Sequence, residues 1–372
     1  MLWSCLAPHA LRSLVGKICA QTNSPPVPTS NIMDKVKRLT LKSYSSIALS
    51  SVDIPEILKP KEILIKVCCV GLTQFDYLKK MQLISKYILP EAFPVGIGYD
   101  VAGIVEKVGS EITRFKPGQR VCGRREDPGA VAEFTVLIEE LTSLIPDNVS
   151  FEEAAAFPTC GILALQALRF GNLKRDETIF ITGGSTGVGS FAIQLAKNVF
   201  KARKIVVTCP VEKLEFCKSI GADSCVDQTS ENAFKNIYEE KFDMILDTTG
   251  EARKTGRLIG GGRFIVSVAG IPNPESYSRV GKEISFPMKS LFFLGSLRER
   301  ILASPGIYEY LFINPNSTDL TELFEFLEDG KVKAYPDVSY DGMEKSPEAF
   351  LQIKTGKAKG IVLVKLANNI NQ

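Results

Sequence analysis

The amino-acid sequence predicts an α/β protein with a β-rich domain and a second domain built on a parallel sheet wound on both faces. Three observations support this prediction. The chain has 372 residues, more than a single domain usually contains. Short apolar runs separated by Gly/Pro turns fill residues 35–160. Between about residues 150 and 300, strand-like and helix-like runs alternate with short loops, which is typical of a doubly wound parallel sheet.

The individual elements follow from the hydrophobic pattern. In the β-rich part the clearest strands are expected at residues 62–70, 101–108 and 133–138. A helix is expected at 154–170. The alternating part continues with strands at 178–182, 204–209, 224–226, 243–248 and 263–269, and with helices at 190–200 and 212–220. A helix at 320–328 and a strand at 360–366 are expected to return to the first domain.

Composition excludes several classes of function. With 45 basic and 42 acidic residues, the chain lacks the charge excess of a nucleic-acid-binding protein. The single histidine is His9, so the body of the protein cannot form a Ser-His-Asp or Cys-His triad or a His-ligated zinc site. No apolar run is long enough to span a membrane. The nine cysteines lack metal-binding spacing, which indicates reduced, structural thiols in a reducing compartment.

Residues 1–33 form a separate N-terminal extension in this interpretation. They contain Arg12 and Lys17 and no acidic residue, and residues 9–20 project as an amphipathic helix. This composition is typical of a mitochondrial transit peptide, and the Pro/Ser-rich residues 23–30 are typical of a linker. The alternative is a disordered extension on a cytoplasmic protein. Mitochondrial import is the prediction.

A glycine-rich loop follows the first strand of the alternating part. Residues 183–189 read GGSTGVG between a predicted strand and a predicted helix, the context of a dinucleotide-binding fingerprint. Gly184 and Gly189 take the first and third glycine places, and Thr186 stands in the second. A turn of this kind aims backbone N–H groups at a pyrophosphate, so Ser185, Gly187 and Val188 are also predicted to contact the cofactor. The alternative, a glycine turn without a ligand, leaves the flanking strands and helix unexplained.

The end of the second strand of the alternating part predicts which dinucleotide binds. An NAD enzyme would carry Asp or Glu there to hold the ribose 2′-hydroxyl group. This chain has Cys209 instead, with Lys213 shortly after it. A cation without a carboxylate suits a 2′-phosphate, which favours NADPH. The acidic Glu212 argues against this interpretation, and Lys213 could also be an ordinary solvated residue of a helix.

Eight stretches in order resemble one known family across residues 35–366. They read FPVGIGYDVAG, FKPGQRV, AEF, EAAAFP, ITGGSTGVGSFAIQLAK, KLEFCKSIGAD, FDMILDTTG and GKAKGIVL. The chain resembles the zinc-free quinone oxidoreductases of the medium-chain dehydrogenase/reductase superfamily, in particular the mitochondrial, reticulon-interacting group. The resemblance implies a GroES-like catalytic domain from residues 34–160, completed by 301–372, with a Rossmann NADPH-binding domain inserted at 161–300. It also implies a homodimer formed through the edge of the Rossmann sheet.

The resemblance also implies a reaction. Zinc alcohol dehydrogenases carry Gly-His-Glu where this chain has Tyr99 between Gly98 and Asp100, so no metal is expected. Without a Lewis acid the natural reaction is hydride transfer from NADPH to a quinone or to the β-carbon of an α,β-unsaturated carbonyl.

The site residues that the resemblance implies come from both domains. Related enzymes have Asn-Pro-x-Asp and an aromatic residue near the nicotinamide; here Asp76 and Tyr77 remain after Thr73-Gln74-Phe75. Asp76 is expected to bind the cofactor, and Tyr77 is the candidate proton donor or stacking residue, with Tyr87 and Tyr99 as rivals. The alternative interpretation of Tyr77 is a half-buried structural aromatic residue. The expected cofactor contacts also include Gln228, Thr249 and Gly270.

Several departures from the family pattern keep other functions open. Leu163 replaces a threonine near the nicotinamide, Gln228 replaces a tyrosine, and residues 251–262 are too few for the usual helix. These changes favour, as one alternative, an NADPH-binding scaffold or sensor with little catalysis. A second alternative is an enoyl-thioester reductase of mitochondrial fatty acid synthesis, which a tyrosine donor would suit. The quinone or enone reductase remains the leading prediction.

Overall fold

The computed structural model describes residues 35–43, 46–54, 58–81, 93–230, 237, 239–279, 286–303, 306–354, 358 and 360–366. The chain divides into two compact units, Met1–Asp34 and Lys35–Gln372. The predicted transit peptide and linker, in the first unit, lie outside the described residues. Among the described helices, none is long and apolar enough to cross a membrane.

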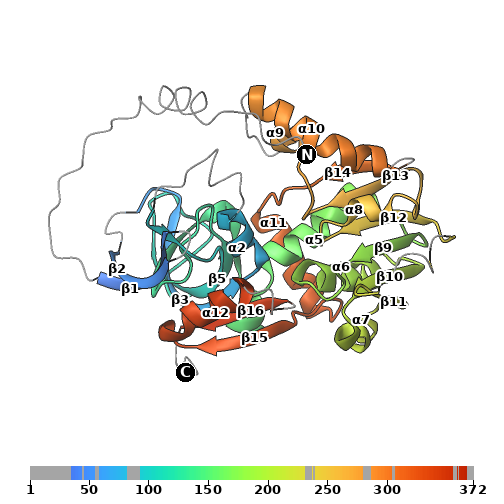
Figure 1. The fold of residues 1–372 in the computed structure, drawn as a ribbon. Helices are drawn as coiled ribbons and strands as arrows, with labels where there is room; N and C mark the ends of the chain where they lie inside the picture. Colours follow the sequence, from blue (N-terminus) through green and yellow to red (C-terminus); the bar gives the residue numbers. More distant parts are fainter. Residues whose placement is uncertain are drawn as a thin grey trace. The chain divides into compact units, whose positions relative to one another are not determined.

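A six-stranded parallel sheet forms the second half of the fold. Its strands are β9 (Thr178–Thr182), β10 (Lys204–Cys209), β11 (Ser224–Asp227), β12 (Phe242–Asp247), β13 (Ile259–Ser267) and β14 (Ile307–Tyr310). They lie side by side in the order β11-β10-β9-β12-β13-β14, and every neighbouring pair is parallel (Figure 1). In chain order this is 3-2-1-4-5-6, the doubly wound Rossmann arrangement. The predicted fold class is confirmed.

The helices around this sheet differ in part from the prediction. They are α5 (Pro158–Phe170), α6 (Gly187–Asn198), η2 (Val211–Lys213), α7 (Leu214–Ser219), α8 (Ala252–Thr255), α9 (Pro274–Arg279) and α10 (Phe286–Ala303). The single helix expected at 154–170 is wrong. A separate helix, α4 (Phe151–Ala155), precedes α5, which begins at Pro158 because proline suits the first turn of a helix better than its interior. The helices α9 and α10 were not predicted.

The β-rich part forms two mainly antiparallel sheets. The larger contains β15 (Pro336–Asp341), β16 (Ile361–Lys365), β3 (Glu62–Leu72), β5 (Asp100–Val108), β6 (Arg120–Arg124) and β8 (Thr142–Leu144), in this order, and β7 (Phe134–Ile138) also pairs with β3. The smaller contains β2 (Ser46–Asp53), β1 (Lys35–Ser43) and β4 (Val95–Gly96). Four further elements are α2 (Gln74–Met81), η1 (Glu139–Leu141), α11 (Ser317–Glu328) and η4 (Met343–Lys345), and α12 (Ser346–Lys354) precedes β16.

The C-terminal segment returns to the first domain, as expected. Val364 of β16 pairs with Val70 of β3 in antiparallel register. The expected boundaries at residues 160 and 300 fall inside α5 and α10, and β14 still belongs to the parallel sheet. We therefore propose that the nucleotide-binding domain begins at α5 and ends after β14.

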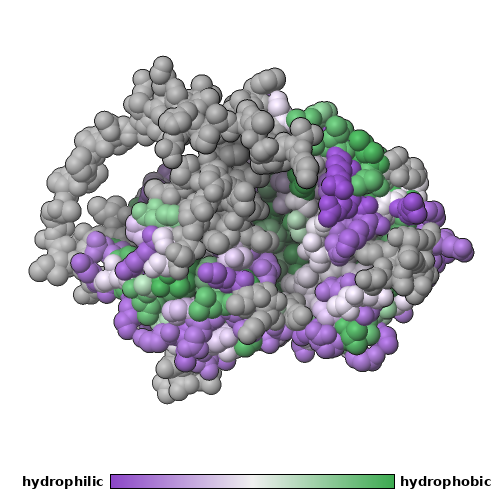
Figure 2. Space-filling model, in the orientation of Figure 1, coloured by the Kyte–Doolittle hydropathy of each residue, from purple (hydrophilic) through white to green (hydrophobic). Residues whose placement is uncertain are grey.

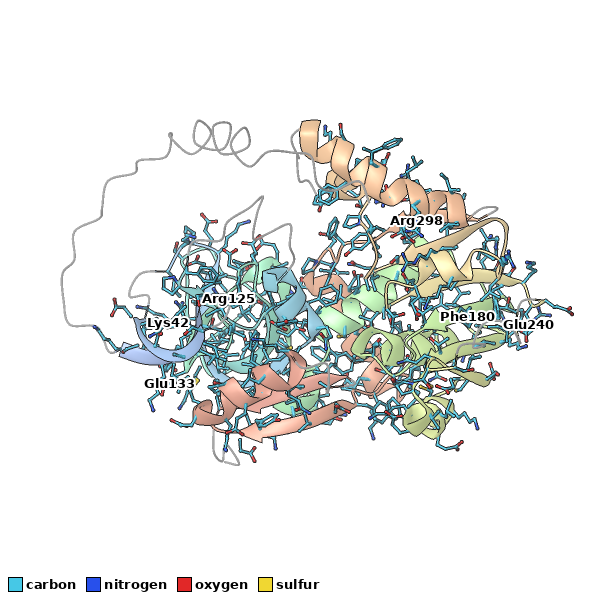
Figure 3. The ribbon with its side chains drawn as sticks, viewed as in Figure 1. Lys42, Arg125, Glu133, Phe180, Glu240 and Arg298 are labelled. Carbon is cyan, nitrogen blue, oxygen red and sulfur yellow. The ribbon has the colours of Figure 1, made fainter. Side chains whose placement is uncertain are left out.

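One hydrophobic core joins the two sheets. It contains Cys69 of β3 and Leu363 of β16 together with Ile181 of β9, all nearly inaccessible to solvent. In the parallel sheet, Phe180 packs against Phe242 with ring centres 5.4 Å apart. Figure 3 labels Phe180 in this sheet and Arg125 in the β-rich part. Because buried side chains of the parallel sheet and of the larger antiparallel sheet share this core, we expect these two sheets to move little relative to each other.

Candidate cofactor-binding site

The glycine-rich loop links the end of β9 to the start of α6. Gly183 has a φ of 69°, a backbone conformation that favours glycine and allows the tight turn. Its N–H donates to Thr208 Oγ1 at 3.0 Å, and the N–H of Gly184 donates to the Thr208 carbonyl at 2.7 Å. Thr208 lies near the end of β10. The loop is therefore held against the neighbouring strand by two hydrogen bonds.

Thr186, the departure from the glycine pattern, has a structural reason. It is the N-cap of α6, and its Oγ1 accepts a hydrogen bond from the Gly189 N–H at 3.0 Å. The same oxygen lies 3.0 Å from Thr248 Oγ1 at the end of β12. The N–H groups of Gly187 and Val188 lie in the first turn, where a helix has no internal acceptors. Together with the helix dipole they can bind a phosphate.

Three glycines of the loop lie where no side chain fits. A Cβ on Gly189 would lie 2.1 Å from the Gly183 carbonyl oxygen, and one on Gly184 would lie 2.8 Å from Cβ of Val207. A Cβ on Gly187 would lie 2.6 Å from Sγ of Cys160 on α5. The close approach of helix to strand that a dinucleotide fingerprint requires is thus present.

Asp247 organises the strand ends around this loop, and the sequence analysis missed it. Its fully buried carboxylate accepts hydrogen bonds from Thr182 Oγ1 at 2.8 Å, Ser267 Oγ at 2.7 Å and the Glu251 N–H at 2.8 Å. These partners lie on or after three adjacent strands, β9, β13 and β12. The only signal in the sequence was an acidic residue closing an apolar strand. The carboxylate fixes where the strands end, and so the edge on which a cofactor would lie.

The residues predicted to bind the adenosine end of the cofactor lie at the same carboxyl edge of the sheet. Cys209 is fully buried, and its carbonyl accepts a hydrogen bond from the N–H of the exposed Gln228 at 3.0 Å. Lys213, in η2, is half-buried, and its Nζ lies 3.0 Å from Asp337 Oδ1 on β15. The structure therefore brings Lys213 to the expected end of β10 and pairs it with a carboxylate that the sequence analysis did not anticipate.

Thr249 and Gly270 lie beyond the ends of β12 and β13. Thr249 is exposed, and its Oγ1 lies 2.9 Å from Thr182 Oγ1. The Gly270 N–H donates to Ser267 Oγ at 2.9 Å. Between β9 and β12 the winding of the sheet reverses, and open α/β sheets bind ligands outside the carboxyl ends of strands at such a point. The roles of Thr249 and Gly270 as cofactor contacts stay predictions, but both residues lie at the position that such contacts require.

The β-rich part contributes a buried acidic cluster close to the loop. Thr159 of α5 donates to Asp100 through its N–H at 2.9 Å and its hydroxyl at 2.6 Å. The next residue, Cys160, is the one that Gly187 faces. Asp76 is also buried, and its Oδ2 accepts the Thr73 N–H at 2.7 Å. One helix N-terminus therefore connects the acidic cluster of the β-rich part to the first turn of α6.

The predicted tyrosines occupy different environments. Tyr77 is half-buried, packs against the core of the β-rich part and meets Phe350 of α12 edge to face, with ring centres 6.3 Å apart. This contact fits the structural alternative, and a catalytic role for Tyr77 stays a prediction. Tyr99 is buried beneath Arg124, whose guanidinium carbon lies 4.6 Å from the ring centre. Tyr87 lies outside the described residues.

The side chains around Tyr99 do not fit a zinc ion. Arg124 Nε donates to Thr159 Oγ1 at 2.9 Å and lies 4.0 Å from Asp100 Oδ1, so a fixed positive charge already lies beside this carboxyl group. In the described part of the chain, no three His, Cys, Asp or Glu side chains are grouped to hold a metal ion. A zinc ion here would meet the Arg124 charge without the usual set of thiolate and imidazole ligands.

Asp100 predicts a pH-dependent stability. Burial raises the pKa of Asp100 to about 7, although Arg124 and Thr159 act to lower it. The folded protein then holds this proton more tightly than the unfolded chain, whose aspartates titrate near 3.8. Because ionisation costs the folded state more, the free energy of unfolding should decline as the pH rises through this range. We expect the wild type to lose roughly 2–3 kcal/mol between about pH 5 and pH 8 relative to Asp100→Asn, measured by urea unfolding.

Comparison with known proteins identifies the superfamily. Residues 59–147 match the alcohol dehydrogenase GroES-like domain family, and residues 220–364 match a family described as zinc-binding dehydrogenase. The chain is 31% identical over 347 residues to 2-methylene-furan-3-one reductase of Solanum lycopersicum, a match covering 90% of this chain and 80% of that protein. This chain belongs to the medium-chain dehydrogenase/reductase superfamily.

Other members of the superfamily are similar over most of their length. The chain is 31% identical to the chloroplastic NADPH-dependent alkenal/one oxidoreductase of Arabidopsis thaliana, covering 85% of this chain and 74% of that protein. It is 29% identical to the mitochondrial NAD(P)H oxidoreductase RTN4IP1 of Danio rerio, covering 84% and 86%. The solved quinone oxidoreductase from Coxiella burnetii superposes with a TM-score of 0.77 at 23% identity, covering 90% of this chain and all of that one.

Proposed function

We propose that this medium-chain dehydrogenase/reductase is an NADPH-dependent, zinc-independent reductase that transfers hydride to a quinone or an α,β-unsaturated carbonyl. One observation carries the proposal. A glycine-rich loop at the switch point of the sheet adjoins, through α5, a buried cluster of the β-rich part in which Arg124 lies beside Asp100. The names of relatives that reduce alkenals, enones or quinones support it.

The electrophile follows from the lack of a group of metal-ligating side chains in the described part of the chain. Alcohol oxidation needs a group that stabilises an alkoxide, and the Arg124–Tyr99 pair is engaged in its own contacts. Reduction of an electron-poor double bond needs less from the protein, because the bound cofactor supplies the hydride. The chain's own residues would bind the pyrophosphate at 183–189, hold the 2′-phosphate at Lys213 and exclude water. Tyr77 remains the proposed proton donor or stacking residue.

A cofactor-oxidation assay tests the proposal. The purified full chain is mixed with a 1,2-quinone or a conjugated enone, and the oxidation of NADPH and NADH is followed by absorbance. We expect turnover that favours NADPH. In Lys213→Met the dissociation constant for NADPH should rise about 10- to 100-fold, because a charge-assisted contact to phosphate is lost, while that for NADH stays unchanged.

The matched control for this assay is Lys218→Met. Lys218 lies on α7, is exposed and pairs with Glu215 at 2.9 Å, so its loss should leave both cofactors unaffected. NADPH binding without turnover across the acceptors would contradict the reductase and favour an NADPH-binding scaffold. Selective turnover of carrier-linked enoyl chains would instead favour the enoyl-thioester reductase.

We also propose that the protein is a homodimer formed through the free edge of the parallel sheet. The edge strand β14 contacts α10, which exposes a stripe of apolar side chains (Figure 2). The exposed fractions are 45% for Phe293, 66% for Leu294, 37% for Leu297 and 64% for Ile301. Monomers rarely leave such a stripe uncovered. Light scattering of the purified chain should give twice the mass of one chain.

The N-terminal extension supports a mitochondrial location as a further proposal. Residues 1–33 are basic and acid-poor, and one relative is named as mitochondrial. Import into isolated mitochondria should occur with the full chain and fail when these residues are removed. Import that persists without them would contradict the proposal and favour a cytoplasmic protein carrying an unrelated extension.

A further inference from the structure

The segment between α11 and β15 crosses the nucleotide-binding domain and is tied to α6. Asn198 Nδ2 donates to the Lys331 carbonyl at 2.6 Å. Gln194 Nε2 donates to the Lys333 carbonyl at 3.0 Å, and the Lys333 N–H donates back to Gln194 Oε1 at 2.8 Å. Two residues of the segment, separated by one position, therefore bind this domain through their backbone groups.

Further along, two side chains of the segment contact α7 and η2. The rings of Tyr335 and Phe216 meet edge to face with centres 5.4 Å apart. Asp337, two residues later, reaches Lys213, with Oδ1 3.0 Å from Nζ. The segment thus delivers a carboxylate of the catalytic domain's β15 to the cation that follows β10 in the nucleotide-binding domain.

The Lys213–Asp337 pair is better sheltered than an ordinary surface ion pair. The side chains are 29% and 18% exposed. The Lys213 ammonium also lies 5.8 Å from the centre of the Phe216 ring. Salt and water screen such a pair less than a fully exposed one. The electrostatic attraction between Lys213 and its carboxylate partner is therefore stronger than in a surface ion pair. Any anion that binds Lys213 must compete with that partner.

NADPH and NADH differ only in the 2′-phosphate, and Lys213 lies where this group is expected. The phosphate would compete with Asp337 for the Lys213 ammonium and would be repelled by the carboxylate. NADH brings no such group and leaves the pair intact. We infer that Asp337 is a specificity-determining residue that limits the preference for NADPH over NADH by competing with the 2′-phosphate for Lys213. This inference rests on the proposed function of Lys213.

Calorimetric titration of the full chain with NADPH and with NADH tests the inference. In Asp337→Asn the dissociation constant for NADPH should fall about 3- to 10-fold, while that for NADH should change less than about twofold. Asp337→Glu keeps the charge and should retain the wild-type ratio of the two constants. The matched control is Asp341→Asn, on the same strand, whose exposed carboxylate lies 3.5 Å from Lys365 Nζ; it should leave both constants unchanged.

The outcomes separate this inference from the proposed function. If Lys213→Met weakens NADPH alone and Asp337→Asn changes neither cofactor, the inference is wrong and the cofactor site stands. If Lys213→Met leaves NADPH binding intact, both are wrong. Weaker NADPH binding in Asp337→Asn would mean that the carboxylate positions Lys213. An equal change in the two dissociation constants would mean that Asp337 has a structural role. Either result overturns the inference. If Asp337→Asn does not fold, Asp337→Ser provides the same comparison.

Discussion

Replacing Gly189 with alanine is expected to abolish NADPH binding at micromolar concentrations and to destabilise the fold. The new Cβ would lie 2.1 Å from the Gly183 carbonyl oxygen and 3.0 Å from the Gly184 carbonyl carbon, so only backbone movement could admit it. Alanine would add up to about 1 kcal/mol of helix propensity, but overpacking typically costs about 1–3 kcal/mol, so the clash should win. The displaced loop would no longer aim its N–H groups at the pyrophosphate. Cofactor fluorescence titration and urea unfolding measure both effects.

A glycine outside the loop provides the control. A Cβ on Gly260 of β13 would meet Arg263 Cγ at 3.4 Å and the Phe242 carbonyl oxygen at 3.5 Å, which is ordinary van der Waals contact. Gly260→Ala should therefore bind NADPH like the wild type and change the free energy of unfolding by less than about 1 kcal/mol. Normal NADPH affinity in Gly189→Ala would show that the pyrophosphate does not bind at this loop.

Asp247→Ala is expected to lower the free energy of unfolding by about 3–5 kcal/mol. The substitution removes an acceptor that the Thr182 and Ser267 hydroxyls and the Glu251 N–H all use in a fully buried site. The fully buried Thr182 and Ser267 hydroxyls would lose charge-assisted bonds and find no water to replace them. Since the same carboxylate sets the strand ends, NADPH affinity should fall by at least about tenfold.

Asp243→Ala, at the opposite end of the same strand, is the comparison for Asp247. Its carboxylate accepts hydrogen bonds from the Thr178 N–H and hydroxyl but is 38% exposed, so water can replace it. We expect a cost of about 1–1.5 kcal/mol and unchanged NADPH affinity. Equal losses of stability from the two substitutions would contradict the central role of Asp247.

Local sequence signals predicted those parts of the fold that depend on near neighbours. The central strands β9 and β10 are buried, mostly apolar runs bounded by turns, and the loop at 183–189 requires glycine for reasons of φ and space. Length and the change of pattern near residue 150 predicted the two domains and the return of the C-terminal segment, and the resemblance to a family then supplied their architectures. Helix α10 escaped prediction because apolar residues lie on both its faces, as buried Phe292 and exposed Leu294 illustrate. An amphipathic period is absent from such a helix.

The sequence by itself determined the parallel sheet, the glycine loop and the absence of histidine chemistry in the body of the protein. Tertiary structure alone decided that Asp247 joins three strand ends, that Arg124 lies beside Asp100, and that Asp337 reaches Lys213 across 124 positions of the chain. The reason is physical. Periodicity and glycine conformations are properties of a few consecutive residues, whereas a buried ion pair or a shared carboxylate depends on strand register and on domains that meet only in the folded chain.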